Sequence, residues 1–132
     1  MALTRINNQA LTNVTSAGLP SGTVLQVKQG ETSTQVIHST ASFADTGLSV
    51  SITPTSTSSK ILVIVNQHCY RNGAGGGALR LVRAGSVIHE DAQRYQSYGD
   101  EAANRDFHNM QYLDSPSTTS AITYKTQGRT HS

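Results

Sequence analysis

Charged residues, cysteine and tryptophan are all scarce in this chain of 132 residues. Only 14% of the residues are charged, whereas an ordinary soluble domain carries about 25%. The net charge is +2 and the basic residues are scattered, which excludes the basic patch of a nucleic-acid-binding protein. The single cysteine, Cys69, excludes an intrachain disulfide and any zinc-finger pattern.

Long apolar runs are absent as well. The longest strongly apolar run, residues 61–65, falls far short of the roughly 18 residues that a membrane-spanning segment needs. Residues 1–14 have no apolar core of signal-peptide length. We therefore expect a protein that is made in the cytoplasm, without processing and without membrane insertion.

Small hydroxyl side chains take the place of the missing charges. The chain has 16 Ser and 16 Thr, which together are about 24% of its residues. They alternate with apolar residues over residues 48–53 and fill the segments 55–59 and 115–120. This pattern is typical of the solvent-facing side of strands and of the turns between them.

The apolar residues predict strands and no amphipathic helix. Residues 48–52 alternate with period two, which indicates a half-buried strand. Residues 60–65 are apolar on both faces, which predicts a central strand covered on both sides. The turn at 84–86 predicts a hairpin. We expect strands at residues 24–27, 32–40, 48–52, 60–70, 78–82, 87–89, 107–113 and 121–125, with a long loop at 90–106 and a polar tail at 127–132.

Strands of this length and spacing indicate an all-β fold, a small antiparallel β-sandwich or jelly roll over residues 23–132. Residues 1–22 form a different segment. Their apolar residues have a weak helical period, and a breaker follows at 18–22. We expect an extended arm that lies on another molecule; the alternative is a disordered terminus. The anchoring residues would be Leu3, Ile6, Leu11 and Val14.

The core expected from these strands is thin for two sheets. One explanation is that the domain buries further apolar surface against copies of itself. The other is that the domain is incomplete at its C-terminal edge, because no apolar residue follows Tyr124. The sequence leaves both explanations open.

Catalytic chemistry is not indicated. His89 and Glu90 are adjacent, but neighbours on a strand point to opposite faces. Cys69 has no base that the sequence positions beside it, and we interpret it as a buried apolar residue. Three further carboxylates do not by themselves indicate the catalytic pair of a glycosidase, and we interpret them as solvated loop charges: Asp100, Glu101 and Asp106. We expect that the protein is not an enzyme.

Metal and cofactor sites are not indicated either. A threefold axis could gather three copies of His68 or of His108, but a hydrogen-bonded strand histidine is the simpler interpretation. The glycines of segment 73–77 precede a strand rather than a helix, which indicates a hairpin tip and not a phosphate loop. We expect neither a metal nor a cofactor.

The expected loop at 90–106 holds the best candidates for recognition, Arg94, Tyr95 and Tyr98. Tyrosine offers a large rigid contact and arginine a hydrogen-bonding fork, a combination that suits a receptor or a sugar. The alternative is that the tyrosines cover the edge of the core or a subunit interface.

Four stretches carry a resemblance to a known family. They are GTVLQV at 22–27, GLSVSITPTSTSSKILV at 47–63, GGGALRLVRAGS at 75–86 and LDSPSTTSAITYK at 113–125. In these stretches the chain resembles the tail-fibre and appendage proteins of marine and cyanobacterial phages. The resemblance covers roughly residues 22–126.

The resemblance implies a small β-sandwich or jelly-roll head that forms a homotrimer on a virion appendage, with the N-terminal arm docked to the particle. Members usually continue with one or two more strands after the TYK segment, whereas this chain stops at Ser132. The expected function is that of a phage tail fibre that attaches to a glycan or protein on the host surface. Its partners would be other virion proteins of the tail or capsid, with assembly in the host cytoplasm.

Two other functions remain in view. The first is a capsid decoration protein that stabilises the shell, for which the same arm and the same trimer would serve. The second is a carbohydrate-binding or depolymerase module, which would use the tyrosines of the 90–106 loop.

Overall fold

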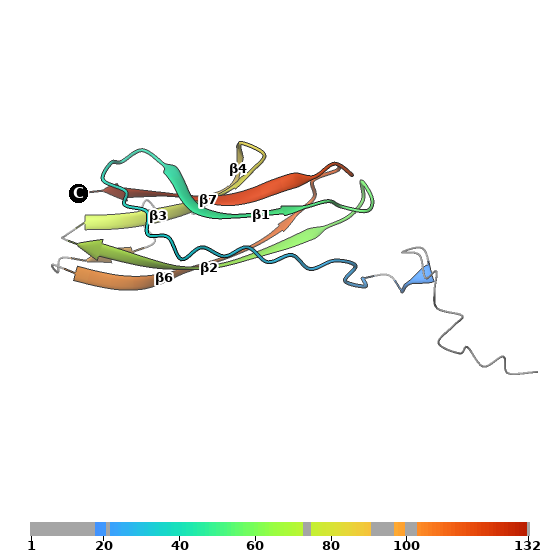
Figure 1. Ribbon diagram of the computed structural model, residues 1–132, viewed down its shortest axis with the longest axis horizontal. Coiled ribbons are helices and arrows are strands. Elements are labelled where there is room, and N and C mark those ends of the chain that lie inside the picture. Colours follow the sequence, from blue (N-terminus) through green and yellow to red (C-terminus); the bar gives the residue numbers. More distant parts are fainter. Residues whose placement is uncertain (1–17, 21, 73–74, 91–96, 100–102, 132) are drawn as a thin grey trace, which may run out of the picture.

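The computed structural model describes residues 18–20, 22–72, 75–90, 97–99 and 103–131. Within these ranges the regular structure consists of antiparallel strands, and no α-helix is present (Figure 1). The part of the chain described here holds no helix long and apolar enough to cross a membrane. The strands are β1 (Ala44–Ile52), β2 (Ile61–Asn72), β3 (Gly75–Arg83), β4 (Ser86–Glu90), β5 (Ser97–Gly99), β6 (Ala103–Asp114) and β7 (Ile122–His131).

The strands form two sheets that lie one over the other (Figure 1). The larger sheet has the order β1-β7-β3-β4, and β5 pairs with the start of β3. The smaller sheet is a long pair of β2 and β6, in register from Ile61 opposite Asp114 to Asn72 opposite Ala103. The prediction of an all-β, sandwich-like fold is therefore confirmed.

The core lies between the two sheets. Alternate residues of β1, β2, β6 and β7 face it, whereas β3 is buried on both faces, at Ala78, Leu79, Leu81 and Val82. The buried cluster of the core comprises Val65 and Met110 from the smaller sheet, and Leu79, Leu81 and Tyr124 from the larger one. Burying each aliphatic side chain of this kind contributes about 1.5–3 kcal/mol. Half-buried residues surround the cluster, among them Val50, Ile52, Val63 and Ile88.

Hydrogen-bonded polar side chains lie at both ends of this core. At one end the Asp114 carboxylate accepts hydrogen bonds from Arg83 Nη1, at 2.8 Å to each oxygen, and from the Tyr124 hydroxyl. Towards the other end the Thr46 and Thr126 hydroxyls are hydrogen-bonded, and Thr126 Oγ1 donates to Gln67 Oε1 at 2.8 Å. Both groups join the two sheets, and buried polar atoms need such partners.

The hairpin predicted at 84–86 is confirmed. Arg83 pairs with Ser86, and Ala84 and Gly85 have φ values of 47° and 90°. Positive φ at both central residues is the geometry of a type I′ turn, which matches the twist of the flanking strands.

Residues 22–43 follow an extended path without a strand, so the predictions of strands at 24–27 and 32–40 are wrong. No segment of the described chain offers them a ladder partner. Residues 30–40 instead lie against the larger sheet: a side chain at Gly30 would collide with the backbone of Ser49, and Thr130 N donates to Thr40 O at 3.1 Å. Figure 1 shows this segment passing between β1 and β2 and continuing beyond the end of the sheets.

Two further predictions need correction. The predicted loop at 90–106 contains β5, which pairs with the glycines at 75–77, and the first residues of β6. The predicted polar tail at 127–132 is wrong over residues 127–131, because β7 continues through it between β1 and β3. Its polar side chains are tolerated there because they have hydrogen-bond partners: Gln127 is bonded to Arg80 and Asp45, and Thr130 Oγ1 donates to Thr40 O.

Candidate functional site

The smaller sheet has one face on the core and one face in solvent. Its solvent face, called the β2–β6 face below, alternates with the core residues along both strands, as the pleat of a strand requires. All of its residues are exposed. They are Leu62, Ile64, Asn66, His68 and Tyr70 of β2, and Arg105, Phe107, Asn109, Gln111 and Leu113 of β6.

The alternation of β6 agrees with the sequence, which places residues 107, 109, 111 and 113 on one side of the strand. The prediction for residues 60–65 is wrong in one respect. β2 is not covered on both sides, because the side chains of Leu62 and Ile64 are 59% and 67% exposed. Phe107 and Leu113 are exposed to a similar degree.

Residues of this face contact each other across the two strands. Leu62 lies opposite Leu113 in the ladder. The rings of His68 and Phe107 are 5.1 Å apart with an interplanar angle of 58°. The Arg105 guanidinium lies 5.7 Å from the centre of the Tyr70 ring, within the range of a cation–π contact. The face therefore presents ordered rows of side chains to solvent.

The solvent face of the larger sheet is different in character. Asp45 accepts hydrogen bonds from Lys125 Nζ at 2.6 Å and Gln127 Nε2 at 2.7 Å. These two bonds, that of Lys125 first, hold the pKa of Asp45 below its usual value. Gln127 in turn accepts two hydrogen bonds from Arg80, which forms an ion pair with Glu90 at 3.6 Å. The polar groups of this face satisfy one another.

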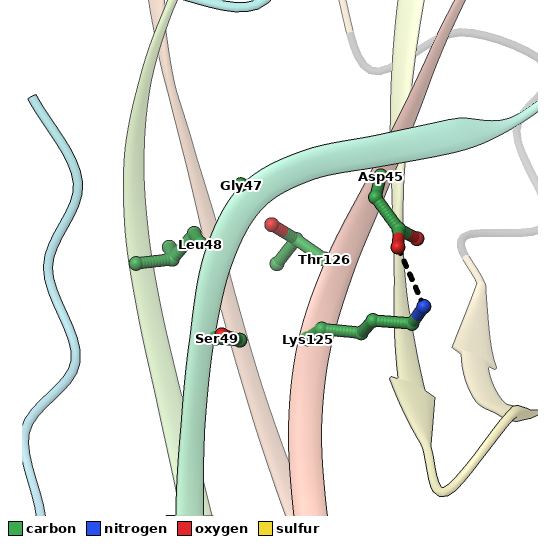
Figure 2. A pocket seen from close by; sticks show the side chains of 6 residues that line it. All are labelled: Asp45, Gly47, Leu48, Ser49, Lys125 and Thr126. Carbon is green, nitrogen blue, oxygen red and sulfur yellow. Dashed lines mark hydrogen bonds and ion pairs between the residues drawn. The ribbon is translucent and has the colours of Figure 1, made fainter. Parts of the chain in front are cut away.

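A small hollow lies where β1 bends at Gly47 (Figure 2). Here the pairing of β1 with β7 shifts register between Asp45 and Ser49, and Gly47 has a φ of 85°. The hollow measures about 80 Å³, whereas small-molecule sites measure about 300–1,000 Å³. The Asp45–Lys125 ion pair stands beside it, and the space suits a few water molecules rather than a substrate.

The interior carboxylate, Asp114, is the most buried charged group of the described chain, and its surroundings indicate a structural role. Burial raises the pKa of Asp114, but hydrogen bonds from Tyr124 and Arg83 outweigh that effect and lower it overall. Burial, followed by the hydrogen bond to Asp114, raises the pKa of Tyr124. Both oxygens of this carboxylate are occupied, and it joins β3, β6 and β7.

The two histidines considered for a metal site on a threefold axis lie on opposite faces of the smaller sheet. His68 belongs to the β2–β6 face, whereas His108 points into the sandwich, where burial lowers its pKa and favours neutral imidazole. Among the described residues no group of three His, Cys, Asp or Glu side chains could hold a metal ion. Cys69 is half-buried, and burial raises its thiol pKa to about 11.

The predicted recognition and anchoring residues are placed only in part. Tyr98 lies in β5 opposite Gly76. The others lie outside the described residues, namely Leu3, Ile6, Leu11, Val14, Arg94 and Tyr95. The β2–β6 face was not predicted from the sequence, although its signal was present: residues 61–65 are apolar at every position, including those that a two-layer sandwich leaves in solvent.

Comparisons with known proteins return no match. No family model matches the chain, and neither a curated protein nor a solved structure is similar to it.

Proposed function

We propose that this chain is a structural protein of a phage virion, a tail-fibre or appendage component that mediates attachment to the host surface. In this proposal the working unit is a homotrimer, each chain supplies one jelly-roll head, and the N-terminal arm joins the head to the particle.

One observation carries this proposal: a sandwich-like domain along which residues 22–43 run as an extended segment that leads to residues 18–20, beyond one end of the sheets (Figure 1). Residues 30–40 hold this segment against the larger sheet, whereas Val24 and Val27 are 75% and 80% exposed. The arrangement of a head and a leading segment suits a domain displayed at a distance from its anchor. It agrees with the resemblance to phage appendage proteins over residues 22–126.

The chain path supports the finer architecture. β1 lies in the larger sheet, β2 in the smaller, β3 in the larger, β6 in the smaller and β7 again in the larger. Repeated crossing between two antiparallel sheets is common to Greek-key sandwiches, the class to which the jelly roll belongs. A trimeric head would bind its receptor by multivalency, because several weak contacts on one particle add to a strong attachment.

The test is to locate the chain on particles of a phage whose genome encodes it. Immunogold labelling with an antibody against the purified chain should decorate the appendages. Label distributed over the shell would instead favour a capsid decoration protein, and particles without label would refute a virion role.

A second test concerns the arm. Deletion of residues 1–20 should leave the circular dichroism spectrum of the β domain unchanged and abolish incorporation into particles. Because the described domain begins after this segment, incorporation of the shortened chain at the level of the full chain would contradict the anchoring role.

A further inference from the structure

We propose that the β2–β6 face packs against the same face of other copies of this chain. This inference rests on the proposed function, since it names the surface through which the proposed trimer forms. The starting observation is the row of large apolar side chains that this face leaves in solvent, at Leu62, Ile64, Phe107 and Leu113.

The size of the face fits an interface between subunits. Each of its two strands has 12 residues, which span about 40 Å at about 3.4 Å per residue. With about 10 Å for the width of two strands, the flat footprint is about 400 Å² per copy. Two copies would remove about 800 Å² from water before the relief of the side chains is counted. This flat area is about two thirds of the lower end of the range of about 1,200–2,000 Å² that stable interfaces bury, and the side chains that stand out from the face add to it.

The charge of the face also favours a partner of its own kind. Arg105 is its only charged residue, and it stands at one end of the strands beside Tyr70. Two identical charged surfaces repel each other, but here each copy contributes only the single positive charge of Arg105 to the contact. A strongly charged partner would find no complementary charges here.

The order of the residues supplies a register for the contact. Leu62 and Leu113 lie opposite each other at one end, His68 and Phe107 towards the other, and Asn66 lies opposite Asn109 between them. If copies pack with their strands aligned, each of these pairs of residues meets the same pair of the neighbouring copy. An amide both donates and accepts hydrogen bonds, so the asparagines of neighbouring copies can pair in the middle of an otherwise apolar contact. A buried asparagine of this kind fixes the register of other symmetric assemblies.

The larger sheet does not offer such a surface. Its solvent face is covered by the connected side chains of Asp45, Lys125, Gln127, Arg80 and Glu90. Packing a second copy there would remove water from several charged groups that already satisfy one another, at a cost that a new contact must exceed.

Sedimentation velocity of the full chain tests the proposal. The unmodified protein should sediment as an oligomer at micromolar concentration. Ile64→Lys should weaken self-association by about 100-fold or more, because it places a lysine in the contact of every copy. The same change at an exposed apolar residue of β4, Val87→Lys, is the matched control and should leave the oligomer intact. Circular dichroism should show that both variants keep the β fold, since both side chains are exposed.

Cross-linking gives a second readout that does not depend on weakening the contact. Asn66→Cys should form disulfides between copies under mild oxidation, while Cys69 stays unreactive because its pKa is raised to about 11. A trimer leaves one of its three engineered thiols free, whereas a dimer leaves none.

The outcomes separate this inference from the proposed function. A monomeric full chain, or an oligomer that Ile64→Lys leaves intact, overturns the inference even where the protein is found on appendages. If the chain is a monomer and Ile64→Lys abolishes its incorporation into particles, the β2–β6 face instead binds another virion protein. An oligomer that depends on Ile64 but never occurs on particles supports the inference and refutes the virion role.

Discussion

Replacement of Asp114 by asparagine should destabilise the domain strongly although it preserves the shape of the side chain. The Asp114 side chain is 6% exposed and accepts two hydrogen bonds from Arg83 and one from Tyr124. Removing one partner of a buried ion pair costs about 3–5 kcal/mol. The Arg83 side chain is 28% exposed and keeps some water, so we expect the lower end, about 3 kcal/mol.

Thermal unfolding followed by circular dichroism measures this effect. For a domain of this size about 3 kcal/mol corresponds to a fall in Tm of about 12 °C, at a fixed protein concentration. The matched control is Asp45→Asn, which removes an ion pair to Lys125 from the surface, where the Asp45 side chain is 53% exposed. Exposed pairs of this kind contribute about 0–1 kcal/mol, so the control should lower the Tm by no more than about 4 °C.

The pH dependence gives the same prediction a second measurement. The pKa of Asp114 is lower in the folded protein than its usual value of 3.8. Its contribution to stability is therefore complete above about pH 4 and is lost as the pH falls through the folded pKa. The difference between the unmodified protein and Asp114→Asn should shrink below pH 4. A difference under 1 kcal/mol at pH 7, or one that is equal at pH 7 and pH 2, would refute this account of the carboxylate.

Three further predictions concern single residues. Tyr124→Phe should make the free energy of unfolding fall less steeply with pH above pH 10. The pKa of the Tyr124 phenol is raised in the folded protein, so its contribution to stability is present below pH 10 and is lost above it. An unchanged dependence on pH in this range would contradict the prediction. Gly30→Ala should lower the Tm and hasten proteolysis of residues 22–43, because the added methyl group would collide with the backbone of Ser49 in β1. The control, Gly18→Ala, adds a methyl group in open space and should change neither quantity. Equal effects of the two changes would contradict the close approach of Gly30 to β1. The thiol of Cys69 should react with a disulfide reagent at pH 8 far more slowly than in the unfolded chain, and equal rates would show that its raised pKa is wrong.

The sequence predicts the strands of this fold well where side-chain alternation marks one buried face. Residues 48–52 alternate with period two, and in β1 the apolar residues Leu48, Val50 and Ile52 face the core as expected. Residues 107–113 also lie in a strand, as predicted. The hairpin at 84–86 follows from a turn whose glycine accepts a positive φ. These features depend on local patterns, which the chain carries within a few residues.

Pairing between distant segments could not be predicted in the same way. Residues 24–27 have strand-forming side chains but no ladder partner in the described chain, so they stay extended and exposed. Residues 127–131 have few apolar side chains, yet they form part of a strand because β3 supplies a partner for all of them and β1 supplies one as far as Gly128. The prediction that β2 is covered on both sides was wrong for a related reason. Apolar residues on both sides of a strand indicate that both sides are covered, but they do not show whether the cover comes from the same chain or from another one.

The position of β7 has a consequence for the order in which this protein is made. β7 is the last of the described strands, and among these strands it is the only one that pairs with β1. The pair of Ala44 and Gly128 joins residues that are far apart in the sequence. The partner of β2 is β6, which is also late in the sequence. A ribosome therefore releases the strand-forming segments of the first half before either sheet can close. Neither sheet can be completed until β6 and β7 have left the ribosome, and contacts of such long sequence separation form slowly. Until then β2 is unpaired and apolar on both sides, and the nascent chain is at its most vulnerable to aggregation or to capture by a chaperone.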